Sequence, residues 1–547
     1  MKIITLIIIL LYGTFMFSQN NTLFNAGLFS NSQYYVDNKK TGDFNESNRF
    51  RSNNYLNLNY QFNNITAQIQ FEGYAPNALL NFSTNYNNSF NIATFSLNYK
   101  TQKLNATLGY FYDQFGSGLI FRAFEDRHLG INNAIFGGFF SYQLTNFFKV
   151  KGFYGKQRKG FKLSEGNLKG INTKLDFSDL LHLKKIQFSY EFSYVGRYQH
   201  VEKTNPLFNK TTNSFSNAIY FTKKNFYANA EYVFKNKDAL VENKTIFDSR
   251  LFSGNALLFN TGFTINNFSM NGTFRRVENM YFYTDRTQRG NPFNNQQVNY
   301  IPSLTKQQDF SLANIYVYQA QPQLSFDPVG KSGEIGFQID AFYKLKRGSK
   351  LGGKYGTQLS LNYSRWSGLN AIYNLGDRIY SSKFLSFGTK YYSDFNIEIR
   401  KKWSKKITTL NTFMWQFYNK KWLEDSIGEI NTFLILSETS YKLNSKISTR
   451  LKLEHLQSKN NTKNWFAATS EFYFNNFSVY ISDIYNYGNN NTIEKIHYYN
   501  FGGRYSKNKY RFSLNYGRQR GGLICVGGIC RLVPRTTGLS ATINANF

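Results

Sequence analysis

Strict alternation of apolar and polar residues is the feature that most constrains how this chain can fold. Over residues 55–62 every second side chain is apolar, and after Asn63 and Asn64 the same period resumes over residues 65–72. A period of two places the apolar side chains on one face of a β-strand. Asn tolerates the positive φ that a tight hairpin turn requires. The two segments are therefore predicted to form a β-hairpin.

The same unit recurs along the whole chain. Tight turns are predicted near residues 63, 102, 145, 183, 224, 266, 405, 445, 475 and 508, and the intervening connections are longer and more polar. Short turns on one side and long loops on the other are typical of outer-membrane β-barrels. One apolar and one polar face per strand also explain a mean hydropathy of -0.47 in a membrane protein.

Composition excludes several other classes. The 41 Tyr and 55 Phe exclude a disordered chain. Beyond the N-terminus there is no run of about 20 apolar residues, so a bundle of transmembrane helices is excluded as well. Soluble β-sandwiches or a propeller are the remaining alternative, but a repeated blade motif is missing. The prediction is an all-β fold with a single large transmembrane antiparallel β-barrel.

The N-terminal residues are predicted to direct export. Met1–Ser18 combine Lys2 with the apolar run Ile3–Leu11, which is the pattern of a signal peptide, and polar residues follow from Gln19. An uncleaved membrane anchor is the alternative, but the apolar stretch is short for a span. Residues 1–18 are therefore assigned to a cleaved signal peptide and residues 19–547 to the barrel.

The C-terminal residues predict the destination. The last run alternates from Leu539 and closes on Phe547, and it resembles the assembly signal of Gram-negative outer-membrane barrels. The expected location is the outer membrane. The expected partners are outer-membrane lipid, lipopolysaccharide and the outer-membrane assembly machinery.

Length predicts the size of the barrel. Closure is required in lipid, because an open edge would leave backbone groups unpaired. One strand together with half of a short turn and half of a long loop takes up about 20 residues, so residues 19–547 predict about 26 strands. The region 310–400 leaves a range of about 22 to 26 open. Alternation starts so early that an N-terminal plug domain is not expected. Inward-folded loops are expected to fill the lumen instead, from Phe115–Asn133, Val277–Gln308 and Ser367–Ser386.

Two of these segments carry clustered charges. The candidate lumen or gate residues are Arg122, Glu125, Asp126 and Arg127 in the first segment, and Glu278, Asp285, Arg286 and Arg289 in the second. Such charges can line a constriction. In the alternative interpretation the first segment packs into the lumen and satisfies its own charges, whereas the second is a solvated extracellular loop.

No catalytic, cofactor or metal site is predicted. Nothing in the sequence links a Ser or Cys nucleophile to His128, so an enzyme is not expected. Cys525 and Cys530 are the only cysteines, and an exported chain favours a disulfide between them. The adjacent Gly527 and Gly528 allow the sharp turn that this bond needs. A metal site would need more ligands.

The formal charge is 65 − 33 = +32, which favours an anionic partner. Nucleic acid is not expected, because the basic residues are scattered and no nucleic-acid motif is present. Lysines recur at the predicted short turns, where they would form a solvated rim. Arg450, Lys452 and Arg511 are predicted to face the lumen, where they could favour anions.

The segments Phe111–Gly138 and Gly521–Pro534 resemble an uncharacterised family of large Bacteroidota outer-membrane barrel proteins. The resemblance implies a location and a barrel fold but no activity. The leading functional hypothesis is a porin-like channel or transporter for solutes, with the lumen restricted by inward loops. The alternative is a non-conducting scaffold of an envelope assembly or protein-export complex, because general porins need only about 16–18 strands.

Overall fold

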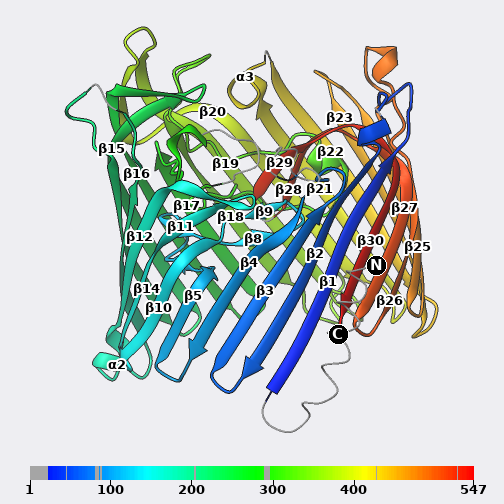
Figure 1. Ribbon diagram of the computed structural model, residues 1–547. Helices are drawn as coiled ribbons and strands as arrows, with labels where there is room; N and C mark the ends of the chain where they lie inside the picture. Colours follow the sequence, from blue (N-terminus) through cyan, green and yellow to red (C-terminus); the bar gives the residue numbers. More distant parts are fainter. Residues whose placement is uncertain are drawn as a thin grey trace.

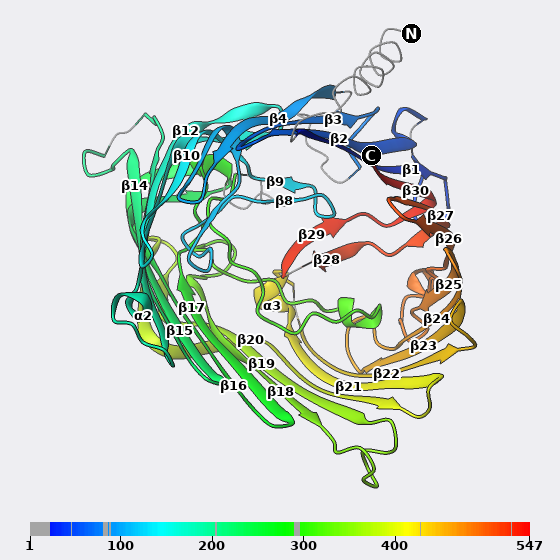
Figure 2. The same cartoon turned by 90° about the horizontal axis from the view of Figure 1, so that it is seen from below.

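The computed structural model describes residues 22–547, apart from 45, 80–85, 87–88, 203–204, 289–295, 427 and 527. The predicted signal peptide, residues 1–18, lies outside the described residues. Over the described residues the chain forms one antiparallel β-barrel of 24 strands (Figures 1 and 2). The predicted all-β barrel fold is thereby confirmed.

The barrel strands are β1 (Thr22–Tyr35), β2 (Phe50–Phe62), β3 (Ile65–Tyr74), β4 (Ser89–Lys100), β5 (Leu104–Phe111), β10 (Ile135–Thr145), β11 (Phe148–Lys159), β12 (Lys162–Asp176), β13 (Gln187–Tyr198), β14 (Thr211–Lys223), β15 (Phe226–Glu242), β16 (Thr245–Ile265), β17 (Phe268–Glu278), β18 (Gly333–Lys344), β19 (Thr357–Asn374), β20 (Ile379–Lys402), β21 (Ile407–Asn419), β22 (Glu429–Lys442), β23 (Ile447–Ser458), β24 (Trp465–Phe474), β25 (Phe477–Tyr485), β26 (Asn500–Lys507), β27 (Tyr510–Gln519) and β30 (Thr536–Asn546).

The connections contain further short elements. These are the strands β6 (Gln114–Phe115), β7 (Phe121–Arg122), β8 (Glu125–Asp126), β9 (Ile131–Asn132), β28 (Gly522–Val526) and β29 (Ile529–Val533), and the helices η1 (Glu46–Asn48), α2 (Phe177–Leu180), η3 (Arg286–Gln288), η4 (Leu312–Asn314), α3 (Lys420–Leu423) and η5 (Thr492–Glu494). Within the described part of the chain, no helix combines the length and the apolar character needed to span a membrane.

The first and last barrel strands close the ring. Strands β1 and β30 pair antiparallel from Gly27↔Asn546 to Tyr35↔Gly538. The backbone N–H of Phe547 also donates to the carbonyl of Ala26, at 2.8 Å. Closure satisfies the backbone groups of both strands, as a hydrocarbon environment demands. The alternating C-terminal run is therefore the closing strand of the barrel.

The tight turns lie at one end of the barrel, which is the lower end in Figure 1. All ten predicted turns separate paired strands, and the connection 345–356 between β18 and β19 adds an eleventh at this end. Asn63, Asn266 and Asn475 have φ values of 50°, 50° and 51°. The left-handed conformation expected of these asparagines is thus present, and the lysines at the turns are exposed.

The strand number of 24 lies within the expected range and is two below the central estimate. The ten turns, with the first and last strands, account for 22 strands, and the region 310–400 that was left open adds only β18 and β19. The reason is that residues 279–332 form one long connection between β17 and β18. This connection enters the lumen and does not cross the barrel wall.

The outer face of the barrel is apolar. Phe90 on β4, Leu108 on β5 and Ile481 on β25 are 68%, 68% and 62% exposed, and similar outward side chains surround the ring. Exposed apolar side chains in such numbers would be unfavourable in water. They match the lipid-facing band of a transmembrane barrel.

Replacement of Ile481 by Arg tests this assignment. We expect Ile481→Arg to lower the free energy of unfolding by about 2–4 kcal/mol in lipid vesicles, because the charge would enter hydrocarbon. The measurement is denaturant unfolding of the folded barrel in vesicles, with Ile481→Leu as the matched control. Equal stability of the arginine and leucine variants would contradict a lipid-facing position.

Candidate functional site: the filled lumen

Two long connections fold into the barrel (Figure 2). Residues 112–134 follow β5 and residues 279–332 follow β17. Their apolar side chains form one core with the inner faces of β10 to β17. The buried members from the two connections are Phe115, Leu119, Ile120, Phe121, Ala123, Met280, Phe282, Val298, Ile301 and Ala320, and those from the wall include Ile135, Leu168, Val195, Val233 and Ala256. This side of the lumen is therefore packed.

The connection 279–332 then reaches the opposite wall. Phe310 and Leu312 pack against inward residues of β21 to β24, including Met414, Leu434 and Leu456. Tyr316 and Tyr318 belong to a second cluster there, which contains Trp366, Tyr392 and Tyr418. One connection thus contacts both sides of the ring and crosses the lumen between them.

A third connection, residues 520–535, contributes the hairpin β28–β29. The predicted disulfide between Cys525 and Cys530 is present at its tip and is confirmed. Gly528 has a φ of 81°, and an added Cβ would lie 2.7 Å from the carbonyl oxygen of Ser303. Only glycine fits this close approach. The neighbouring Gly527 lies outside the described residues.

The hairpin is bonded to the other two connections. The Ser303 N–H donates to the Gly528 carbonyl at 2.8 Å. Arg531 donates through Nη1 to the Leu129 carbonyl at 3.0 Å. Arg520 donates through Nη2 to the Asn314 carbonyl at 2.7 Å. We refer to the described residues of 112–134, 279–332 and 520–535 together as the lumenal plug.

Glutamates on the barrel wall hold the backbone of the plug. In each case a backbone N–H of the plug donates to a glutamate carboxylate of the wall. The pairs are Gly116 to Glu191 (2.8 Å), Ser117 to Glu231 (2.9 Å), Phe326 to Glu242 (2.7 Å), Gln321 to Glu334 (2.7 Å), Ser311 to Glu454 (3.1 Å) and Leu312 to Glu454 (2.7 Å). Hydrogen bonds to an ionised acceptor are among the strong ones. The wall therefore fixes the plug at points far apart around the ring.

Wall cations make the complementary bonds to plug carbonyls. Arg197 donates to Tyr283 at 2.8 Å, Lys235 to Tyr281 at 3.0 Å, and Arg275 to Pro302 at 2.7 Å. Arg275 also pairs with Glu334 at 2.6 Å, and both side chains are almost completely buried. Sequence reasoning missed this set of wall residues. Their inward positions follow from the alternation, but their partners are distant in sequence.

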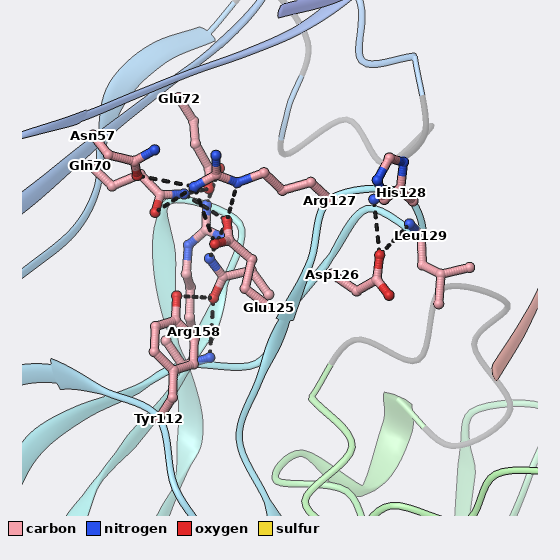
Figure 3. A network of polar contacts seen from close by, with 12 residues as sticks. Asn57, Gln70, Glu72, Tyr112, Glu125, Asp126, Arg127, His128, Leu129 and Arg158 are labelled. Carbon is pink, nitrogen blue, oxygen red and sulfur yellow. Dashed lines mark hydrogen bonds and ion pairs between the residues drawn. The ribbon is translucent and has the colours of Figure 1, made fainter. Parts of the chain in front are cut away.

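The first predicted charged segment joins the plug to β2 and β3 (Figure 3). Arg127 pairs with Glu125 at 3.2 Å and donates to Asn57 at 3.0 Å. Gln70 donates to the Glu125 carboxylate at 2.8 Å. Nearby, Arg158 on β11 is ion-paired with Glu72 on β3, and both side chains are buried. That ion pair spans three intervening strands of the ring.

The other two predicted residues of this segment have local roles. Arg122 lies over the ring of Tyr300, with Cζ 3.9 Å from the ring centroid. Asp126 accepts the N–H groups of His128 and Leu129 at 2.9 and 3.1 Å. The described geometry places all four predicted charges in the lumen, where each has a partner. It matches the interpretation of a packed loop that satisfies its own charges.

The second predicted segment is buried. Asp285 accepts the N–H groups of Glu165 and Gly166, both at 3.0 Å. Arg286 pairs with Asp238 at 2.8 Å. Both predicted residues are at most 2% exposed. The alternative of a solvated extracellular loop is wrong for these residues, because they are buried plug residues that contact β12 and β15.

The remaining predicted residues of the second segment differ in position. Glu278 is the last residue of β17, where it accepts from Arg276, Ser382 and Asn255 at 2.6, 2.6 and 3.1 Å. Arg289 lies outside the described residues. The third predicted inward loop, 367–386, is instead the end of β19 and the start of β20. This hairpin contacts the last residue of β17 through the hydrogen bond from Ser382 to Glu278.

Two cavities remain beside the plug along the inner face of β1 and β30. The distal cavity, farther from the short turns, has a volume of about 540 Å³ and is lined by Asn31, Gln33, Tyr35, Ser540, Arg520 and Arg531, among others. The proximal cavity has a volume of about 500 Å³ and is lined by Phe29, Asn57, Asn544, Asn546 and residues 125–128, among others.

The two cavities follow one another along β1. Asn31 lines the distal cavity and Phe29 lines the proximal one, so their Cα atoms are about 7 Å apart at about 3.4 Å per residue. At this junction the Phe29 ring meets the His128 ring of the plug edge to face, with centroids 6.2 Å apart. The lining side chains on both sides of the junction are mostly polar.

The described residues contain no group of three or more His, Cys, Asp or Glu side chains that could hold a metal ion. Burial and the adjacent Glu334 carboxylate raise the pKa of Tyr318, in the plug, well above its usual value. The Tyr318 hydroxyl therefore stays protonated and donates to Glu334.

Comparison with known proteins identifies the family. The model of a family of unknown function, DUF6029, matches residues 1–547, and the chain belongs to this family. This agrees with the resemblance to an uncharacterised family. No curated protein matches.

Solved structures with a similar course of the chain are outer-membrane barrels. A ferric enterobactin receptor (PfeA) mutant from Pseudomonas aeruginosa has 10% identity and a TM-score of 0.44, with 96% of this chain and 80% of that chain covered. The translocation pore of the P pilus usher (PapC) has 10% identity and a TM-score of 0.37, with 96% and 99% covered. A BenF-like porin from Pseudomonas fluorescens Pf-5 has 8% identity and a TM-score of 0.34, with 85% and 97% covered.

Proposed function

We propose that this member of the DUF6029 family is an outer-membrane channel or transporter for small solutes. The proposed path runs along the inner face of β1 and β30, beside the lumenal plug. The observation that carries the proposal is the succession of the distal and proximal cavities along these two strands. The plug packs against β10 to β17 on one side and against β21 to β24 on the other.

The polar lining supports passage of water-soluble compounds. Asn31 and Ser540 face the distal cavity, and Asn57, Asn544 and Asn546 face the proximal one. Amide and hydroxyl groups exchange hydrogen bonds with a moving solute without binding it tightly, as conduction requires. The contact between Phe29 and His128 would be the narrowest point. The predicted segment 125–128 would then border the constriction.

The proposed location is the outer membrane of a Gram-negative cell. The apolar outer face and the closed ring support this location. The predicted signal peptide at residues 1–18 and the predicted assembly signal ending in Phe547 are consistent with it. Outer-membrane lipid, lipopolysaccharide and the outer-membrane assembly machinery are the corresponding proposed partners.

Cysteine accessibility tests the path. The two native cysteines form a disulfide, so an introduced cysteine would be the reactive thiol. Ser540→Cys would place it in the distal cavity. Ser193→Cys is the matched control, because Ser193 also faces inward but is buried against the packed side of the lumen. We expect a sulfonate-bearing thiol reagent to label Ser540→Cys and to reduce its conductance in a planar bilayer.

The control should neither be labelled nor change its conductance. Equal labelling of the two variants would show that the plug leaves no preferred path. An absence of conductance in the native protein, reconstituted and correctly folded, would remove the proposed function altogether.

The scaffold hypothesis remains the second candidate, because one specific observation favours it. The plug is held by wall glutamates and by buried ion pairs such as Arg275–Glu334. A lumen built in this way can be structural. Under this hypothesis, native purification from outer membranes yields a stable envelope complex, and the isolated barrel conducts no ions.

A further inference from the structure

The distal cavity has an unusual distribution of charge. Arg518, Arg520 and Arg531 line it, and the described residues that line it include no Asp or Glu. Arg520 and Arg531 donate to backbone carbonyls, those of Asn314 and Leu129, and Arg518 donates to the His497 carbonyl and the Asn38 side-chain oxygen. Their positive charges are therefore not neutralised by a carboxylate within the described part of the chain.

Arg450 and Lys452, which were predicted to face the lumen, differ in this respect. Arg450 pairs with Glu471 at 2.7 Å and with Glu438 at 3.4 Å. Lys452 pairs with Glu454 at 3.3 Å. Two acidic residues on connections near the distal cavity also have their own arginines, since Glu494 pairs with Arg535 and Asp37 with Arg49. Among the residues that line the distal cavity, Arg520 and Arg531, together with Arg518, therefore carry positive charge without a carboxylate partner.

Arg531 is more buried than Arg520. It is only 5% exposed, and its Nε atom has no hydrogen-bond partner among the described residues. A buried N–H without a partner is costly, more so on a charged group. Burial lowers the pKa of Arg531 to about 10 and also lowers the pKa of Arg520. An anion in the cavity would offset the cost of burying this charge by placing an opposite charge beside it.

We propose that the distal cavity is a binding site for small anionic solutes that carry carboxylate or phosphate groups, held by Arg520 and Arg531. Planar guanidinium groups match both kinds of oxyanion through paired hydrogen bonds. A volume of about 540 Å³ is large enough for a small organic anion. The lumenal position excludes a lipid headgroup as the bound species. The inference rests on the proposed function and deepens it by naming the solute class.

Binding to the full-length barrel in detergent micelles is the test, with citrate and inorganic phosphate as probes at constant ionic strength. Glucose is the neutral control. We expect at least one of the two anions to bind the native protein, and glucose not to bind. In Arg520→Gln/Arg531→Gln the dissociation constant should rise about tenfold or more, since two charge-assisted contacts are removed.

Arg511→Gln is the matched control. Arg511 also faces the lumen on β27, where it is paired in register with Asn544, but it lies outside the lining of the distal cavity. This variant should bind like the native protein. Arg531→Lys keeps the charge and should retain most of the affinity, which separates loss of the site from loss of the fold.

The failures of the two proposals are distinguishable. Binding in micelles does not depend on conductance, so a native barrel that binds citrate but conducts nothing would remove only the channel. Conductance without binding of either anion would overturn the anion site and leave the channel. Equal weakening in Arg511→Gln and in the double variant would also overturn the site, since lumenal charge in general would then explain it.

Discussion

Excision of residues 281–331, with the ends joined by a four-residue Gly-Ser linker, is expected to raise single-channel conductance about tenfold or more, because wide barrels without a plug enclose an aqueous channel. The barrel wall should survive the excision. Glu278 and Gly333 are paired in register at the ends of β17 and β18, so a hairpin-length linker can join them. Planar-bilayer recording of the purified, heat-modifiable protein is the measurement.

A control deletion can be made at the end of the barrel that carries the short turns. Residues 347–354 lie in the connection between β18 and β19, where most of the side chains are exposed. Their removal should leave the conductance unchanged. If excision of 281–331 also left it unchanged, this connection would not be what restricts the lumen.

The second large effect is expected from Glu334. This carboxylate is fully buried, pairs with Arg275 and accepts the N–H of Gln321 at 2.7 Å. Glu334→Ala is expected to destabilise the plug by about 3–5 kcal/mol, because it leaves the Arg275 charge buried without its partner. Hydrogen exchange of the backbone amides in residues 310–330 is the measurement. The barrel strands should keep their protection while these amides lose theirs.

A double variant and a surface control complete this test. Arg275→Met/Glu334→Leu removes both charges and should recover much of the protection, because apolar pairs often replace buried ion pairs without loss. Glu494→Ala removes an exposed pair with Arg535 and should cost about 1 kcal/mol or less. Unchanged exchange in Glu334→Ala would show that the wall glutamates do not hold the plug.

The barrel wall could be predicted from local sequence. Alternation and Asn-rich turns such as Asn63 and Asn266 located the strands, because side-chain direction in a strand depends only on residue parity. The central estimate of the strand number was two too high, because it assumed about 20 residues per strand throughout, whereas residues 279–332 form one connection. Residues 277–308 were predicted to fold inward, but the rest of this connection, residues 309–332, was left open as barrel wall.

The candidate site was predictable in part. Residues 122–127 and 285–286 were recognised as charge clusters and do lie in the lumen, but their partners, such as Asn57 and Asp238, could not be inferred. The solvated loop proposed for the second cluster was wrong. Charged residues are usually exposed, and only a partner such as Asp238 makes the burial of Arg286 favourable. Arg520 and Arg531 were missed because nothing in their local sequence shows that carboxylates are absent around them.

The sequence alone determined that the chain forms a ring of antiparallel strands with an apolar outside, and where the tight turns and the disulfide occur. These properties depend on residue parity, on turn residues and on one short separation between cysteines. Only the tertiary structure decided that three connections meet inside the ring, that wall glutamates hold them, and that two polar cavities remain along β1 and β30. Those features include contacts between groups more than a hundred residues apart, such as the backbone N–H of Ser311 and the carboxylate of Glu454. Their meeting depends on the closed curvature of the whole barrel.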